Sequence, residues 1–273
     1  MVTTGATSRS AQGPTSGTDY QGSWQVFEDA SEFQDYYTSR QGRHVSMRLR
    51  RSLAEFWSRA PNGCNAAIGY PSPLVRSDDR PPVLAFTPMR LGPHIWPPKG
   101  PNRSALVNGK SLPLQNVQLD RLLLFHALEF DSNPSRLLEE CWRVLDGAGR
   151  LMVMVPNRNG LWARAEKTPF GHGRPYSRGQ LRKLLLDHGF TPVRAETLLF
   201  MPPAAIGLFL RFGPQIERIG RNWSPAIGGV LMVEAEKNLY APAGKTSKAR
   251  SRSLLAAGKL AARPTGSMRE GVD

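Results

Sequence analysis

Hydrophobic residues near the start of the chain recur every three to four positions, which predicts a helix. Over residues 31–60 this apolar face includes Leu49, Leu53 and Phe56, and Pro61 ends the helix. Beyond it the apolar residues come in short runs bounded by turn residues, a pattern typical of strands. The predicted strands are residues 66–69, 83–86, 105–107, 121–125, 151–155, 193–200 and 230–236.

Two further helices are predicted between these strands. Asn133 before Pro134 is an N-cap followed by proline, and the helix that it opens is expected to close at Gly147. Ser177 with Gln180 forms a capping box that opens a helix over residues 178–188. Strands that alternate with amphipathic helices predict an α/β fold, a mostly parallel sheet with helices on both faces. Ligands of such sheets bind beyond the carboxyl ends of the strands.

The composition favours one large domain with polar extensions. The chain has 273 residues, of which 40% are hydrophobic and 21% charged, and we expect a single domain over residues 23–240. Residues 1–22 are small and polar, and we expect them to be disordered. Residues 241–273 hold seven basic and two acidic residues, so +5 of the net charge of +14 lies there. This basic tail is also expected to be disordered.

No membrane-crossing or secretory segment is expected. The longest uncharged apolar stretch, residues 197–210, is 14 residues long and contains two prolines, whereas a membrane span needs roughly 18 to 20 apolar residues. Residues 1–18 lack the apolar region of a secretory signal. The sequence therefore predicts a cytoplasmic protein.

The cysteines and the charge exclude some classes of protein. Cys64 and Cys141 lie far apart, with no second Cys or His at metal-ligand spacing, so we expect neither a disulfide framework nor a metal site. The positive charge is compatible with a nucleic-acid partner. However, the basic residues are not interleaved with stacking aromatic residues, which makes nucleic-acid binding the least favoured function.

The middle of the chain carries motifs that are similar to those of a known family. LPL at residues 112–114 and LDRLLLFHALE at residues 119–129 are similar to the pattern "LPF…FDLVL…HVLEH". EECWRVLDGAGRL at residues 139–151 is similar to "E..RVLKPGGRL". In this order and spacing the motifs resemble the class I S-adenosylmethionine-dependent methyltransferases, in particular the type 11 domain family.

The resemblance implies a fold, a cofactor and a set of site residues. The implied fold is a Rossmann-like sheet of seven strands whose last strand, residues 230–236, is antiparallel. The implied cofactor is S-adenosylmethionine, held above the loop after the first strand. The residues implied to contact it follow the first four strands, and they are Gly69, Tyr70, Ser72, Thr87, Met89, Asn108 and Phe125.

Three departures from the family pattern predict weak cofactor binding. Pro71 and Pro73 stand at the second and third glycine positions of the family's GxGxG loop, and proline has no amide proton to donate. The family's acidic residue after the second strand is missing from Thr87-Pro88-Met89. Asn108 replaces the family's aspartate, although its carbonyl oxygen can still accept a hydrogen bond.

Candidate catalytic and binding residues follow the fourth and fifth strands. His126 ends the fourth strand, and His172 and Tyr176 lie in the long connection after the fifth. Each of the three is a candidate to accept a proton from the methyl acceptor, and their spacing does not choose among them. Arg158 and Arg174 in the same connection are expected to hold an anion of the substrate. The alternative is a solvated loop whose aromatic residues enter the core.

Three functions are compatible with these features of the sequence. The favoured one is methyl transfer from S-adenosylmethionine to a small-molecule or protein acceptor of small or acidic character. The second is a catalytically inactive binding or regulatory protein on the same fold, which the Pro71 and Pro73 loop would explain. The third is nucleic-acid binding through the basic residues.

Overall fold

A computed structural model describes residues 29–59, 63–79, 81–109, 111–203 and 227–239 of the chain. Within them seven strands form one sheet in the order β3-β2-β1-β4-β5-β7-β6. The strands are β1 (Asn65–Gly69), β2 (Val83–Pro88), β3 (Ser104–Val107), β4 (Leu119–Phe125), β5 (Leu145–Pro156), β6 (Phe190–Leu198) and β7 (Val230–Lys237). The expected terminal segments, residues 1–22 and 241–273, lie outside the described residues.

Strand direction agrees with the predicted α/β class. β1 pairs in parallel with β2 and β4, and β4 pairs in parallel with β5. β7 runs antiparallel to both β5 and β6, which confirms the expected antiparallel last strand. In the register of the sheet Gly69 pairs with Phe125 and Ile68 with Phe86, so β1, β2 and β4 end side by side.

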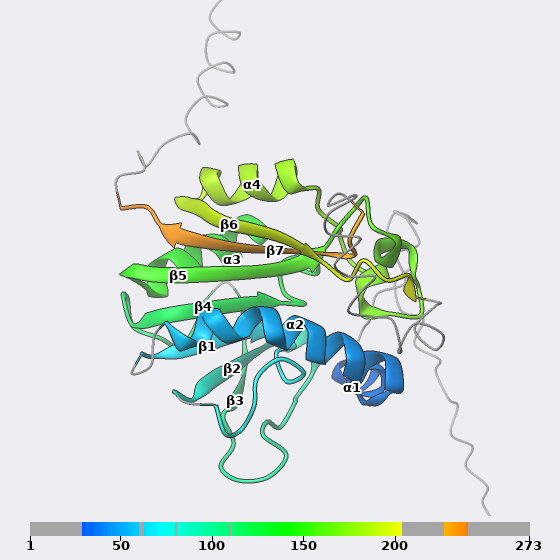
Figure 1. Cartoon of the computed structure of the whole chain (residues 1–273). Coiled ribbons are helices and arrows are strands. Elements are labelled where there is room, and N and C mark those ends of the chain that lie inside the picture. Colours follow the sequence, from blue (N-terminus) through cyan, green and yellow to red (C-terminus); the bar gives the residue numbers. More distant parts are fainter. Residues whose placement is uncertain (1–28, 60–62, 80, 110, 204–226, 240–273) are drawn as a thin grey trace, which may run out of the picture.

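Helices cover both faces of the sheet (Figure 1). One face packs against α1 and α2, whose apolar residues share a core with β1, β4 and β5. The other face packs against α3 and α4. Figure 1 shows α2 in front of the sheet, α3 behind it, and α1 beyond one end of the strands. The helices are α1 (Ala30–Thr38), α2 (Arg40–Ser58), α3 (Pro134–Val144) and α4 (Arg178–Asp187).

The single helix predicted over residues 31–60 is wrong, because the chain breaks at Ser39 into α1 and α2. Ser39 has extended backbone angles, and its hydroxyl caps α2 by accepting a 3.0 Å hydrogen bond from the Gly42 amide. The two helices meet closely at this corner, where a side chain on Gly42 would overlap the backbone of Tyr36. Ser39 and Gly42 thus favour a tight corner over a continuous helix.

The other predicted helices form with the expected caps. The Asn133 side chain accepts from the Arg136 amide, and Ser177 and Gln180 form both bonds of a capping box. α3 ends three residues earlier than Gly147, at Val144, because Leu145 is already extended and pairs with Leu119 of β4.

The β2–β3 side of the sheet has little cover. In the described residues that connect β1 to β2 and β2 to β3, the chain forms turns and one 3-10 helix, η1 (Met89–Leu91), but no α-helix. Leu84 of β2 and Leu106 of β3 are consequently exposed. Among the residues that the structure describes, no helix is long and apolar enough to cross a membrane, and both cysteines are free thiols.

Candidate functional site

Gly69 brings the end of β1 into direct contact with the end of β4. Its φ of +108° lies in a region that side chains disfavour, and a Cβ atom there would overlap the carbonyl oxygen of Phe125. The next amide, Tyr70 N, donates a 2.9 Å hydrogen bond to the same oxygen. The glycine kept from the family loop is therefore required by the geometry of this turn.

Aromatic side chains of α1 cover this turn. The Phe33 ring lies 5.1 Å from Tyr70 and 5.0 Å from His126, measured between ring centroids. Tyr37 stacks on Tyr70 with a centroid distance of 6.1 Å and an angle of 17° between the rings. Since Phe33 and His126 have no exposed surface, the space directly above the ends of β1 and β4 is filled by α1.

His126 is the centre of a buried polar chain. Its Nε2 lies 2.7 Å from the Tyr37 hydroxyl, and its Nδ1 lies 3.0 Å from a carboxyl oxygen of Glu129. Burial holds the pKa of the Tyr37 phenol well above its ordinary value. His126 is thus fully buried, and no ligand reaches it in this conformation.

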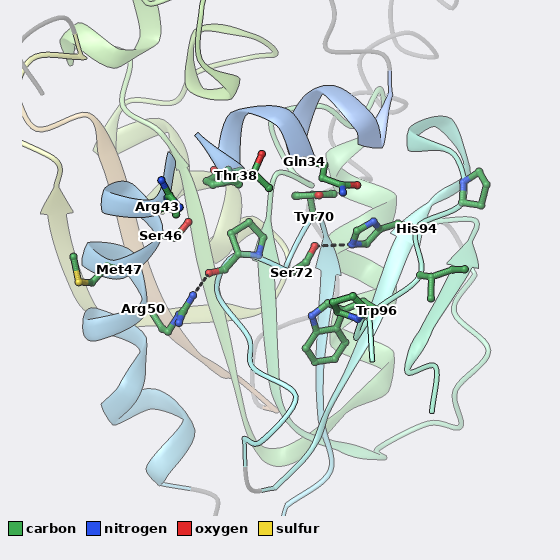
Figure 2. A pocket seen from close by; sticks show the side chains of 15 residues that line it. Gln34, Thr38, Arg43, Ser46, Met47, Arg50, Tyr70, Ser72, His94 and Trp96 are labelled. Atoms are coloured by element: carbon green, nitrogen blue, oxygen red, sulfur yellow. Dashed lines mark hydrogen bonds between the residues drawn. The ribbon is translucent and has the colours of Figure 1, made fainter. Parts of the chain in front are cut away.

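A cavity of about 770 Å³ lies beside the β1 loop (Figure 2). Its size is within the range of roughly 300–1,000 Å³ that is usual for small-molecule sites. Figure 2 shows α2 on one side of it, the segment after β2 on the other, and Ser72 between them. The lining residues are Gln34, Tyr37, Thr38, Arg43, Ser46, Met47, Arg50, Tyr70, Ser72, Pro73, Pro93, His94, Ile95, Trp96 and Pro98.

The charged residues in the lining of the cavity are basic. Arg43 and Arg50 come from one face of α2, and the lining has no Asp or Glu. Arg50 donates a 2.8 Å hydrogen bond to the Pro73 carbonyl, which ties α2 to the β1 loop. Burial, aided by nearby Arg76, lowers the pKa of Arg50. The cavity therefore suits a ligand that carries a negative charge or develops one.

His94 is the histidine of the cavity. Its Nε2 lies 2.8 Å from the Ser72 hydroxyl, a contact drawn in Figure 2, and its ring centroid lies 4.9 Å from that of Tyr70. Burial lowers the pKa of the imidazole, so His94 is neutral near pH 7. Burial also raises the pKa of Tyr70, and a hydrogen bond from Ser72 opposes that rise.

Of the seven residues predicted to bind the cofactor, four lie at or near the cavity and three lie elsewhere. Tyr70 and Ser72 line the cavity, and Gly69 and Phe125 form the turn below it. Three others lie outside the lining: Thr87 is buried, while Met89 and Asn108 are exposed. Their contact with a cofactor stays a prediction.

The long connection after β5 packs away from this cavity. Trp162 and Phe170 are buried, and Trp162 donates a 2.7 Å hydrogen bond to the Met201 carbonyl. His172 Nε2 lies 2.5 Å from the Glu166 carbonyl oxygen. Burial raises the pKa of Tyr176 to about 12, which disfavours a tyrosinate. Neither His172 nor Tyr176 lines the cavity.

The two arginines predicted to hold an anion lie on the surface. Arg158 reaches the Pro175 carbonyl at 3.4 Å. Arg174 lies over the Tyr176 ring, 5.9 Å from its centroid, and borders a separate hollow of about 240 Å³ near α4. Neither lines the larger cavity, and their role in binding stays a prediction.

Twelve of the fifteen lining residues were not singled out from the sequence, among them Tyr37, Arg43, Arg50 and His94. The spacing of Arg43 and Arg50, seven residues apart, was a signal that both lie on one helix face. His94 had no such signal, because no regular element surrounds it. In the described part of the chain, no three His, Cys, Asp or Glu side chains are grouped to hold a metal ion.

The chain is similar in sequence to a methyltransferase over part of its length. No protein-family model matches it. It is 35% identical over 129 residues to a probable S-adenosylmethionine-dependent methyltransferase of two Mycobacterium tuberculosis strains, a match that covers 44% of this chain and 46% of the relative. An uncharacterized protein of Methanocaldococcus jannaschii is 25% identical over 101 residues, or 35% of this chain and 49% of that protein. The chain thus spans about half the length of the curated relatives that it matches.

Two solved structures share most of the fold. A SAM-dependent methyltransferase of Thermotoga maritima matches with a TM-score of 0.51 and 19% identity, over 79% of this chain and 99% of that one. A SAM-dependent methyltransferase of Archaeoglobus fulgidus matches with a TM-score of 0.51 and 16% identity, over 75% and 99%. These likenesses confirm the predicted fold class.

Proposed function

Because this chain is related to the class I S-adenosylmethionine-dependent methyltransferases in sequence and has their fold, we propose that it is an enzyme that transfers a methyl group from S-adenosylmethionine to a small or acidic acceptor. The observation that carries the proposal is the 129-residue match to a probable methyltransferase. The cavity beside the Gly69 turn supports it, because it lies next to the loop at which the family holds its cofactor. A cytoplasmic location remains part of the same proposal.

The residues of the cavity fit part of the cofactor. Arg43 offers a countercharge for its carboxylate, and the ring of Tyr70 offers an apolar face for its adenine. Gln34 and Thr38 offer polar atoms for the ribose hydroxyls in place of the missing acidic residue. When bound, S-adenosylmethionine supplies an activated methyl group. The protein holds the acceptor in line with that group and keeps water out.

Charge predicts the order of affinities. The cavity has two guanidinium groups and no carboxylate in its lining, so it opposes the sulfonium charge of S-adenosylmethionine. S-adenosylhomocysteine lacks that charge. We therefore expect weak binding of S-adenosylmethionine, with a Kd in the micromolar range or above, and tighter binding of S-adenosylhomocysteine.

Isothermal titration calorimetry of the whole chain with both compounds tests this proposal. Arg43→Gln should weaken binding about 10-fold or more, the equivalent of one charged hydrogen bond. Arg51→Gln is the matched control, since Arg51 is an exposed arginine of the same helix outside the lining. If neither compound binds at millimolar concentration, the enzyme proposal fails and the inactive binding protein becomes the better interpretation.

A further inference from the structure

The structure points to a proton acceptor and to a class of methyl acceptor. We propose that His94 accepts the proton of the methyl acceptor, and that this acceptor is a flat apolar compound with an acidic hydroxyl group, such as a phenol. The inference rests on the proposed methyl transfer. Its support comes from the lining of the cavity and from the contacts that fix His94.

His94 is held firmly at the cavity wall. Its carbonyl oxygen accepts a hydrogen bond from the Ser104 hydroxyl, and the Arg103 amide donates a 2.7 Å bond to the Trp96 carbonyl. These bonds tie the segment after β2 to the start of β3. Because the backbone on both sides of the ring is anchored, His94 can act with little reorganisation.

The contact with Ser72 occupies one nitrogen of His94. Nε2 lies 2.8 Å from the Ser72 hydroxyl, whose oxygen can accept as well as donate a hydrogen bond. In the tautomer that the proposal requires, Nε2 carries the imidazole proton and donates it to Ser72. Nδ1 makes no hydrogen bond to any described residue, and its lone pair remains available as a base.

The rest of the lining selects the acceptor. Trp96 offers an aromatic wall for a flat ring, and Pro93 and Ile95 beside it in the sequence are apolar lining residues. Arg50 favours a group that becomes negative and opposes a protonated amine. An acidic hydroxyl on an apolar ring meets both conditions.

The proposed reaction moves one proton and one methyl group. The hydroxyl proton passes to Nδ1 of His94, the oxygen forms a bond to the methyl carbon, and the sulfur keeps the electron pair of the broken carbon–sulfur bond. The positive charge on sulfur is thus lost and one appears on the imidazole. His126, His172 and Tyr176 have no part in this step.

The probe for this inference is 4-nitrophenol, because its phenolate absorbs visible light and its phenol form does not. The whole chain is titrated with the probe, without cofactor, at a pH below the pKa of the free probe. We expect the bound probe to show about a 10-fold higher ratio of phenolate to phenol than the free probe, the effect of a neighbouring cation of about one pKa unit.

Three variants separate a base from a structural contact. His94→Gln should lower the phenolate ratio of the bound probe clearly below that of the wild type and leave only the part that Arg43 and Arg50 contribute. Ser72→Ala should lower the ratio less than His94→Gln does, because it removes the hydrogen bond that positions the ring but leaves the base. His44→Gln, a histidine of α2 outside the lining, should match the wild type.

Each contrary result overturns the inference. Failure of 4-nitrophenol to bind at millimolar concentration excludes the phenolic class. Binding without phenolate, or equal phenolate in wild type and His94→Gln, excludes His94 as the base. Because no cofactor is present, these results are independent of the calorimetric test, whose failure would overturn the methyl transfer itself.

Discussion

Gly69 shows how one residue sets the geometry of the candidate site. It pairs with Phe125 across the sheet and turns the chain so that Tyr70 donates to the Phe125 carbonyl. The turn carries Tyr70 and Ser72 to the cavity wall. Pro71 and Pro73 cost this loop two amide donors, but the Pro71 carbonyl accepts from the Leu74 and Val75 amides and closes a turn. The loop is thus built for rigidity rather than for donating amides to an anion.

Gly69→Ala is expected to destabilise the protein and the cavity. Alanine at a positive φ costs about 1 kcal/mol or more, and here the added methyl group would also overlap the Phe125 carbonyl. Gly100→Ala is the control, since Gly100 has a φ of +96° but an added methyl group there would meet no atom within 4 Å beyond its chain neighbours. Urea denaturation should show a clearly larger loss of unfolding free energy for Gly69→Ala. Equal losses would mean that the overlap is relieved at no cost.

Elements far apart in sequence are joined by a few polar contacts, and Glu140 of α3 is an example. Its carboxylate accepts a 2.6 Å hydrogen bond from the Leu112 amide and binds the Arg143 guanidinium. The hydrogen bond from Arg143 is the main reason that the pKa of Glu140 is lowered from 4.5. This carboxylate therefore fastens the segment before β4 to the helix after it.

The Glu140 contact predicts a specific acid sensitivity. A lowered pKa contributes stability that is complete above the ordinary value of 4.5 and is lost as the pH falls through the folded-state pKa. Glu140→Gln should be less stable than wild type near neutral pH, and the difference should shrink below about pH 4.5. Urea denaturation at a series of pH values measures this. A difference that stays constant across the series would show that the charge of Glu140 is not involved.

The sheet and most helices could be predicted from the sequence because their signals are local. Short apolar runs bounded by turn residues located the strands, and the caps at Asn133 and Ser177 located α3 and α4. The corner at Ser39 was missed, since it depends on the close approach of Gly42 to Tyr36, which no periodicity reports. The candidate site was predicted only in part, because some of its residues are also brought together by packing between distant segments.

Gly69, Tyr70 and Ser72 were found because they lie at the end of a strand or directly after it. The basic wall of the cavity was not, because it comes from α2, which precedes the sheet in the sequence and returns to the β1 loop through the Arg50–Pro73 contact. His94 was missed because its position depends on the pairing of β2 with β3, which brings Ser104 beneath it. Such residues are assembled by packing between elements, and their spacing along the chain has no period.

At the scale of the whole molecule, the sheet is unevenly covered. β4 lies in the centre and six of its seven residues are buried, whereas β3 is a four-residue edge strand with two exposed residues. Local stability follows the number of buried apolar contacts and hydrogen bonds. The two halves of the sheet should therefore differ in how often they open.

Hydrogen–deuterium exchange should resolve this difference. We expect amides of β4, β5 and β7 to exchange slowest, near the rate of global unfolding, and those of β3 to exchange much faster. β6, the opposite edge strand, is an internal comparison because α4 covers it. Equal protection of β3 and β4 would show that the sheet opens as one unit despite its thin edge.

α1 contributes to both the apolar core and the cavity. Phe33 is part of the core, while Gln34, Tyr37 and Thr38 line the cavity. Both folding and ligand binding require α1 to be docked on the sheet, so the two equilibria are thermodynamically linked. A ligand that requires docked α1, present at 100 times its Kd, would favour the docked state by about 2.7 kcal/mol. The same linkage means that a substitution which loosens α1 weakens binding without touching the ligand, so mutations in this nine-residue helix will alter affinity and stability together.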